Sequence, residues 1–200
     1  MCIRDSDTLN LQYDFSFTNS SVKTVNFDHS GASTSSVAPF LDNTELGDSL
    51  LFVQGMEGVN ISFTFPNIED LGSIIVNQAI LELTVVTPVD AVEIFAPVDQ
   101  FLLSEIQPDG ELLLISDVVF AFNAGNIEAF GGDLETDETL NIQRYRLNLS
   151  SVVQQMILGQ ADNEVVMTLL VSNQRANRSV IFGPQHSMFP AKLNITFTDN

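Results

Sequence analysis

Apolar and polar residues alternate strictly along much of the chain. Five stretches follow this period of two: residues 9–17, 59–65, 79–85, 145–149 and 193–197. Because successive side chains of a strand point to opposite faces, the pattern predicts strands with one buried face. Five other runs are apolar on both faces, at residues 50–53, 112–115, 118–122, 165–171 and 180–182, which favours central strands. The pattern therefore predicts an all-β fold.

One segment near the C-terminal end departs from this alternation. Its apolar residues at helical spacing are Val152, Val153, Met156 and Ile157. Ser150 can cap the first turn, and Gly159 suits the left-handed residue just past the end. A weaker helical turn is expected at residues 68–71. We predict an antiparallel two-sheet β-sandwich, jelly-roll-like, with one short α-helix near residues 150–158.

Length and composition favour one packed domain. The chain has 200 residues, of which 44% are hydrophobic, enough for a sizeable core. Residues 1–6 resemble translated sequencing-adapter DNA, so we expect them not to belong to the protein and assign the domain to residues 7–200. Cys2 is the sole cysteine, which leaves no disulfide framework and no thiolate metal site. No apolar run is long enough to predict a transmembrane segment.

The charge of the chain is strongly negative and unevenly placed. The formal net charge is -19, and no Lys or Arg lies between Lys23 and Arg144. Nucleic acid is excluded as a partner, because binding it requires cations on the phosphates. The acidic excess has two interpretations, which are solubility of a secreted protein and attraction of divalent cations.

Two parts of the sequence together resemble a known family. The first runs from residue 49 to residue 79 and includes Ser49-Leu-Leu-Phe-Val-Gln-Gly-Met-Glu-Gly-Val59 and Ile75-Val-Asn-Gln-Ala79. The second contains Tyr145-Arg-Leu-Asn-Leu149, the predicted helix, and Lys192-Leu-Asn-Ile-Thr-Phe197. This order resembles an uncharacterised family of Bacteroidota surface lipoproteins, a domain of unknown function. The C-terminal half is loosely similar to the DNRLRE-type β-sandwich modules of secreted polysaccharide-active proteins.

The resemblance implies a place outside the cell. A member of this family would be exported and anchored to the outer membrane through a lipidated N-terminal cysteine. Cys2 has no lipobox before it, so we expect attachment only through a lipidated N-terminus missing from this sequence. The family has no established activity, and it lends no functional residues to this chain.

One acidic cluster is a candidate metal site. Asp133, Glu135 and Asp137 alternate, so their oxygens can face one side, as calcium requires. The cluster lacks the glycine and the spacing of an EF-hand loop, and solvated carboxylates are the alternative. Calcium is the one cofactor that the sequence suggests.

The C-terminal third holds the candidate ligand-binding residues. Arg144 and Arg146 share one face of a predicted strand, while Arg175 and Arg178 fall in a predicted hairpin loop. Together they would form a cationic patch for carboxylate or sulfate groups, and internal pairing with acidic residues is the alternative. His186 lies in a loop between the last two predicted strands, where binding sites often lie.

These observations leave three functional hypotheses. The first is a non-catalytic extracellular module of a bacterial surface lipoprotein, acting in adhesion, assembly or ligand capture, with a cell-surface protein or polysaccharide as partner. The second is a glycan-binding module of a polysaccharide-uptake system, with or without calcium. The third is a polysaccharide hydrolase with a carboxylate pair that 26 acidic residues conceal. The chain has no Trp, and Tyr145 is expected in the core, which argues against an aromatic sugar platform.

Overall fold

A computed structural model describes residues 37–41, 43–56, 58–86, 96–170 and 176–199. The alternating stretch at residues 9–17, Cys2 and Arg175 lie outside these residues. The described strands are β1 (Leu50–Gln54), β2 (Ile61–Thr64), β3 (Ile74–Thr84), β4 (Phe101–Ile106), β5 (Leu112–Leu114), β6 (Glu135–Asp137), β7 (Ile142–Asn148), β8 (Glu164–Leu169), β9 (Arg178–Phe182) and β10 (Lys192–Asp199). The α-helices are α1 (Thr44–Gly47), α2 (Ser116–Asn123) and α3 (Ser150–Ile157), and the 3-10 turns are η2 (Ala38–Phe40), η3 (Ile68–Leu71) and η4 (Ile127–Ala129).

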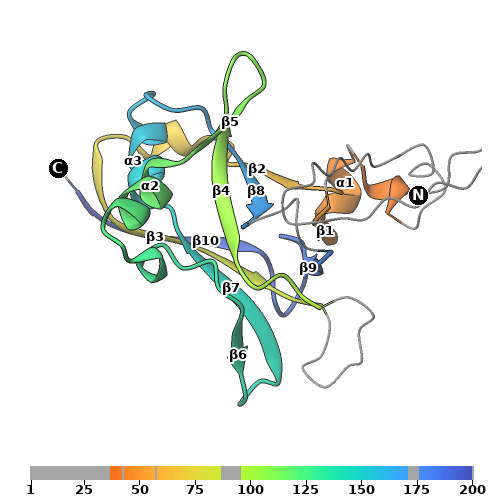
Figure 1. Ribbon diagram of the computed structural model, residues 1–200. Coiled ribbons are helices and arrows are strands. Elements are labelled where there is room, and N and C mark those ends of the chain that lie inside the picture. Colours follow the sequence, from red (N-terminus) through yellow and green to blue (C-terminus); the bar gives the residue numbers. More distant parts are fainter. Residues whose placement is uncertain (1–36, 42, 57, 87–95, 171–175, 200) are drawn as a thin grey trace, which may run out of the picture.

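The all-β prediction is confirmed, and every strand pair is antiparallel. One sheet has the order β10-β3-β7-β6 and the other the order β2-β8-β4-β5. A two-stranded unit, β1-β9, continues the first sheet, because Val85 just beyond β3 forms a bridge with Ile181 of β9. The two sheets face each other as a sandwich (Figure 1).

The core lies between the inner faces of the two sheets. Leu81 and Leu83 of β3 and Leu103 of β4 are 0–2% exposed, as the period-two pattern requires. Tyr145 is also fully buried, as predicted, and its ring meets Phe101 edge to face at 4.5 Å between centroids. Its hydroxyl donates to Val98 O at 2.7 Å and lies 2.9 Å from Ser179 Oγ, so the polar tip is satisfied within the core.

A short segment joins the two sheets at one edge through backbone hydrogen bonds. Gly132 N donates to Arg146 O of β7, and Phe101 N of β4 donates to Gly132 O, both at 2.9 Å. A Cβ on Gly131 would lie 2.2 Å from Arg146 O, and both glycines have φ near +80°. Only glycine fits this close approach, because any side chain would collide with backbone atoms.

The predicted helix is confirmed as α3, and it replaces a strand beside β3. Where β7 ends, Leu149 N donates to Ala79 O and Ser150 Oγ accepts from Ala79 N. One turn later, Gln154 accepts from Val76 N at 2.8 Å and donates to Ile74 O at 3.3 Å. Side chains of the helix therefore satisfy backbone groups of β3 that β7 no longer reaches.

The prediction that Ser150 caps α3 is wrong, because its hydroxyl is engaged with β3 and with Asn148. Asp117 of α2 caps the helix instead. Its carboxylate is 8% exposed and accepts from Ser151 N at 2.8 Å and Val152 N at 2.9 Å. Gly159 has φ +65° just past the helix, as predicted.

Two other expectations about single elements are wrong. Residues 118–122 belong to α2 and not to a central strand, so α3 is not the single helix of the described chain. α2 packs beside α3 at one end of the sandwich (Figure 1). Residues 112–114 form an exposed edge strand, with Leu113 57% exposed. Within the described residues, no helix is long and apolar enough to span a membrane.

Candidate functional site

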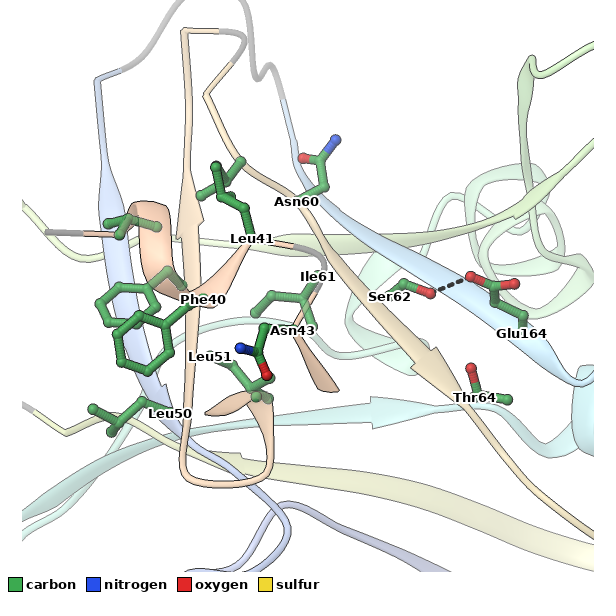
Figure 2. A pocket seen from close by; sticks show the side chains of 14 residues that line it. Phe40, Leu41, Asn43, Leu50, Leu51, Asn60, Ile61, Ser62, Thr64 and Glu164 are labelled. Atoms are coloured by element: carbon green, nitrogen blue, oxygen red, sulfur yellow. Dashed lines mark hydrogen bonds between the residues drawn. The ribbon is translucent and has the colours of Figure 1, made fainter. Parts of the chain in front are cut away.

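A groove opens between β1 and β2. Strand β1 lies at the end of the molecule opposite α2 and α3 (Figure 1). Its volume is about 390 Å³, within the range of small-ligand sites. The 3-10 turn η2, helix α1 and strands β1, β2 and β8 supply its lining (Figure 2).

The groove exists because two consecutive strands separate. Gln54 N at the end of β1 donates to Val59 O just before β2, at 3.0 Å. From this bond onward the strands diverge, since β1 pairs with β9 and β2 pairs with β8 (Figure 2). The space between them is therefore a seam between the two sheets of the sandwich.

One wall of the groove is apolar. It is formed by Val37, Phe40, Leu41, Leu50, Leu51, Phe52, Val59 and Ile61. The Phe40 ring packs on Phe52 with centroids 4.7 Å apart, which fixes η2 against β1. Leu41 remains 41% exposed at the mouth. This wall offers contact area to an apolar part of a ligand.

The other wall carries polar side chains in a row. Ser62 and Thr64 of β2 and Asn60 just before it occupy alternate positions, and all three are exposed. Ser62 donates a hydrogen bond to the Glu164 carboxylate of the neighbouring strand β8 (Figure 2). Hydroxyl, amide and carboxylate groups therefore border the groove on the side of β2, and Asn43 adds a further amide.

The predicted calcium cluster is divided by the fold. Glu135 and Asp137 point toward Arg144, whose Nε lies 3.6 Å from Glu135 Oε2 and whose Nη1 lies 3.6 Å from Asp137 Oδ2. Within the described residues, no three His, Cys, Asp or Glu side chains are arranged to hold a metal ion. Calcium binding by this cluster stays a prediction, in which the ion would compete with a guanidinium for two of the three carboxylates.

Asp133 borders a second hollow of about 170 Å³, together with Asp99, Gln100 and Asn177. Partial burial raises the pKa of Asp133 above its ordinary value of 3.8, and the negative charges of Glu128 and Glu135 add to the rise. This carboxylate is therefore less favourably ionised in the folded protein than in the unfolded chain.

The structure brings together two of the four predicted arginines. Arg144 and Arg146 lie on one face of β7 and contact acidic residues, Arg146 through Glu82 at 4.0 Å. Glu82 also contacts Lys192 Nζ at 3.2 Å. Arg178 begins β9, a strand that does not pair with β7, and Arg175 lies outside the described residues. The alternative of internal pairing therefore holds for Arg144 and Arg146.

His186 packs within its own loop. Its ring stacks on Phe182 with centroids 3.8 Å apart, and its Nδ1 accepts from Phe189 N at 3.0 Å. Next to it, Gln185 donates to Asp48 Oδ2 at 2.7 Å and so ties the loop to the segment before β1. His186 therefore stabilises the loop, and its role in binding a ligand stays a prediction.

Sequence reasoning did not find the groove. Its residues come from five elements, and neither wall carries a motif. The one available signal was the alternation of Asn60, Ser62 and Thr64, which identified a strand and no site. Comparisons of the chain with family models, with curated proteins and with solved structures give no match.

Proposed function

We propose that the chain is a non-catalytic module on the outside of a bacterial cell, which captures a ligand in the groove between β1 and β2. The groove carries the proposal: it combines an apolar wall, built around Phe40 and Leu51, with a polar wall along β2. Ligand sites combine apolar contact area with a few placed polar groups in this way. The acidic charge of -19 and the resemblance to surface lipoproteins support an extracellular, outer-membrane-anchored location.

Leu41 provides the direct test of the groove. It lines the mouth and is 41% exposed, so replacing it by Ala removes ligand contact area at little cost to folding. Leu158 is 58% exposed at the end of α3 and serves as the matched control. The purified chain is screened for binding to polypeptides and to neutral and acidic polysaccharides, with calcium and then with a chelator. Saturable binding that Leu41→Ala weakens and Leu158→Ala leaves unchanged is expected. Equal binding by both variants would move the site elsewhere.

A glycan is the second candidate ligand, and the row of polar groups on β2 favours it. Asn60, Ser62, Thr64 and Glu164 present alternating donors and acceptors, as sugar hydroxyls require. Saturable binding to a polysaccharide and not to polypeptides would support this candidate. Loss of that binding with a chelator would in addition point to Asp133, Glu135 and Asp137.

A further inference from the structure

The backbone of β2 has unpaired groups along the groove. Phe65 N donates to Asn163 O at 2.8 Å, and the register continues through Phe63↔Val165 and Ile61↔Met167. Residue pairs of an antiparallel ladder exchange hydrogen bonds only at every second position. The N–H and C=O groups of Ser62 and Thr64 therefore point away from β8 and toward the groove.

The same reasoning applies to β1. Gly55 N donates to Asn177 O and Gly183 N to Ser49 O, both at 2.9 Å, which sets the bonded positions of the β1-β9 pair. The backbone groups of Leu50 and Phe52 fall between these positions and point away from β9. Within the described chain, the bond from Gln54 N to Val59 O is the one backbone rung between β1 and β2. The groove is therefore lined on both sides by strand edges.

Backbone pairing links most strands of the sandwich in a ring, and β5, β6 and β10 remain edge strands beside it. β9 joins β3 at Val85, β3 joins β7, the glycine segment around Gly132 joins β7 to β4, and β4 joins β8 and then β2. The seam between β1 and β2 interrupts this ring of strands. An unpaired strand edge is a template for another strand.

We propose that the ligand of the groove is an extended segment of a partner protein, which inserts between β1 and β2 as an added strand. This inference rests on the proposed function and names its ligand. Main-chain hydrogen bonds to Ser62 and Thr64 on one side and to Leu50 and Phe52 on the other hold the segment. Since side chains of a strand alternate, its inward residues are apolar and contact Leu51 and Ile61.

The outward residues of the partner segment are basic. They lie beside Glu164, on a protein with a net charge of -19, and charge complementarity favours Lys or Arg there. The alternating stretch of this chain at residues 9–17 is the other candidate occupant. It contains Asp14 and no basic residue, so it would add negative charge to an acidic molecule. The charges therefore favour a basic segment from outside.

The first experiment measures binding of labelled nine-residue peptides to the full chain by fluorescence anisotropy. A peptide of alternating Lys and Val is expected to bind saturably, and an alternating Glu and Val peptide at least tenfold more weakly. The Lys and Val peptide with N-methyl groups at alternate residues cannot donate along one edge, so at least tenfold weaker binding is expected. Equal binding of the methylated peptide would overturn strand addition. Equal binding of the acidic peptide would overturn the charge argument.

Variants of Ser62 locate the added strand. Ser62→Pro removes the outward N–H and places its ring in the groove, which the edge position of β2 tolerates. Leu112→Pro is the matched control, because it places a proline on the exposed edge strand β5, outside the groove. Peptide binding is expected to be lost in Ser62→Pro and kept within about threefold in Leu112→Pro. Melting curves check the fold of both variants. If Ser62→Pro does not fold, the methylated peptide decides the question.

Two further probes separate the possible failures. A peptide of residues 7–18 tests the other occupant, and tighter binding than the Lys and Val peptide would assign the groove to this chain's own segment and overturn the partner. A polysaccharide that binds and depends on Leu41, with no peptide bound, would overturn strand addition and keep the proposed function. Absence of all binding would overturn both.

Discussion

Replacing Asp117 by Ala tests the link between α2 and α3. The carboxylate accepts hydrogen bonds from Ser151 N and Val152 N, and it is 8% exposed. A hydrogen bond to a charged group contributes about 1.5–3 kcal/mol, and loss of a helix cap costs about 0.5–2 kcal/mol. Asp117 accepts two such bonds and the cap figure covers the same contacts, so the loss lies between the cap figure and the sum of the two bonds, at about 2–4 kcal/mol.

The assay is thermal and urea unfolding of matched variants. For a domain of this size each kcal/mol lowers Tm by about 2–4 °C, so Asp117→Ala is expected to melt about 4–16 °C below the parent. Asp117→Asn keeps one acceptor oxygen and loses the charge beside the helix dipole, so its loss is intermediate, about 1–2 kcal/mol. Asp70→Ala is the control, since Asp70 is exposed in the first turn of η3.

A result within about 0.5 kcal/mol of the parent for Asp117→Ala would refute the reasoning, because that is the range of ordinary surface substitutions. Amide hydrogen exchange gives an independent check. Ser151 and Val152 are expected to lose protection in Asp117→Ala, whereas amides in the middle of β3 are expected to change only with global stability.

Three other predictions concern positions away from the groove. Tyr145→Phe leaves Val98 O and Ser179 Oγ without the buried hydroxyl and is expected to cost about 1–3 kcal/mol in urea unfolding; a neutral result would mean that the core relaxes around both groups. Gly131→Ala is expected to lower the free energy of unfolding by about 1–3 kcal/mol more than Gly110→Ala does. Both glycines have φ above +80°, but of the two only Gly131 lies against a backbone oxygen. Equal Tm values would contradict this. Asp133→Asn is expected to raise Tm more at pH 7 than at pH 3.5. Because the pKa of Asp133 is raised in the folded protein, its ionisation destabilises the fold as pH rises from 3.8 through the pKa of the folded state. An equal rise in Tm at both pH values would show that the pKa of Asp133 is not raised.

The alternating segments were predictable because burial of one face leaves a period of two in the sequence. Residues 79–85 and 145–149 lie in or next to β3 and β7 and are buried as the pattern requires. Residues 118–122 were misassigned because a short run of Val, Ala and Phe fits a buried strand as well as a helix. The local signal for a helix here was Ser116-Asp117, which resembles a helix start. Asp117 nevertheless caps α3 and not its own helix α2.

The groove was beyond sequence reasoning for a different reason. Ser62 and Leu50 become neighbours of one opening only after β1 and β2 join different sheets, and that divergence depends on β9 and β8, more than 100 residues away. The acidic cluster shows the converse. Asp133 and Asp137 are close in sequence, yet Asp133 faces a hollow beside Asp99 and Asp137 faces Arg144.

The pairing of early strands with late ones has a consequence for the time course of synthesis. β1 pairs with β9, β2 with β8 and β3 with β10, so each early strand waits for a late one. Residue 54 finds its partner Arg178 only after another 124 residues have been made, and residue 74 waits for Asp199. At about 5–20 residues per second, β1 spends roughly 6–25 s without its partner. Large separations between paired residues also slow folding itself. A nascent chain of this design therefore cannot complete the pairing of β1, β2 and β3 until β8, β9 and β10 have been made.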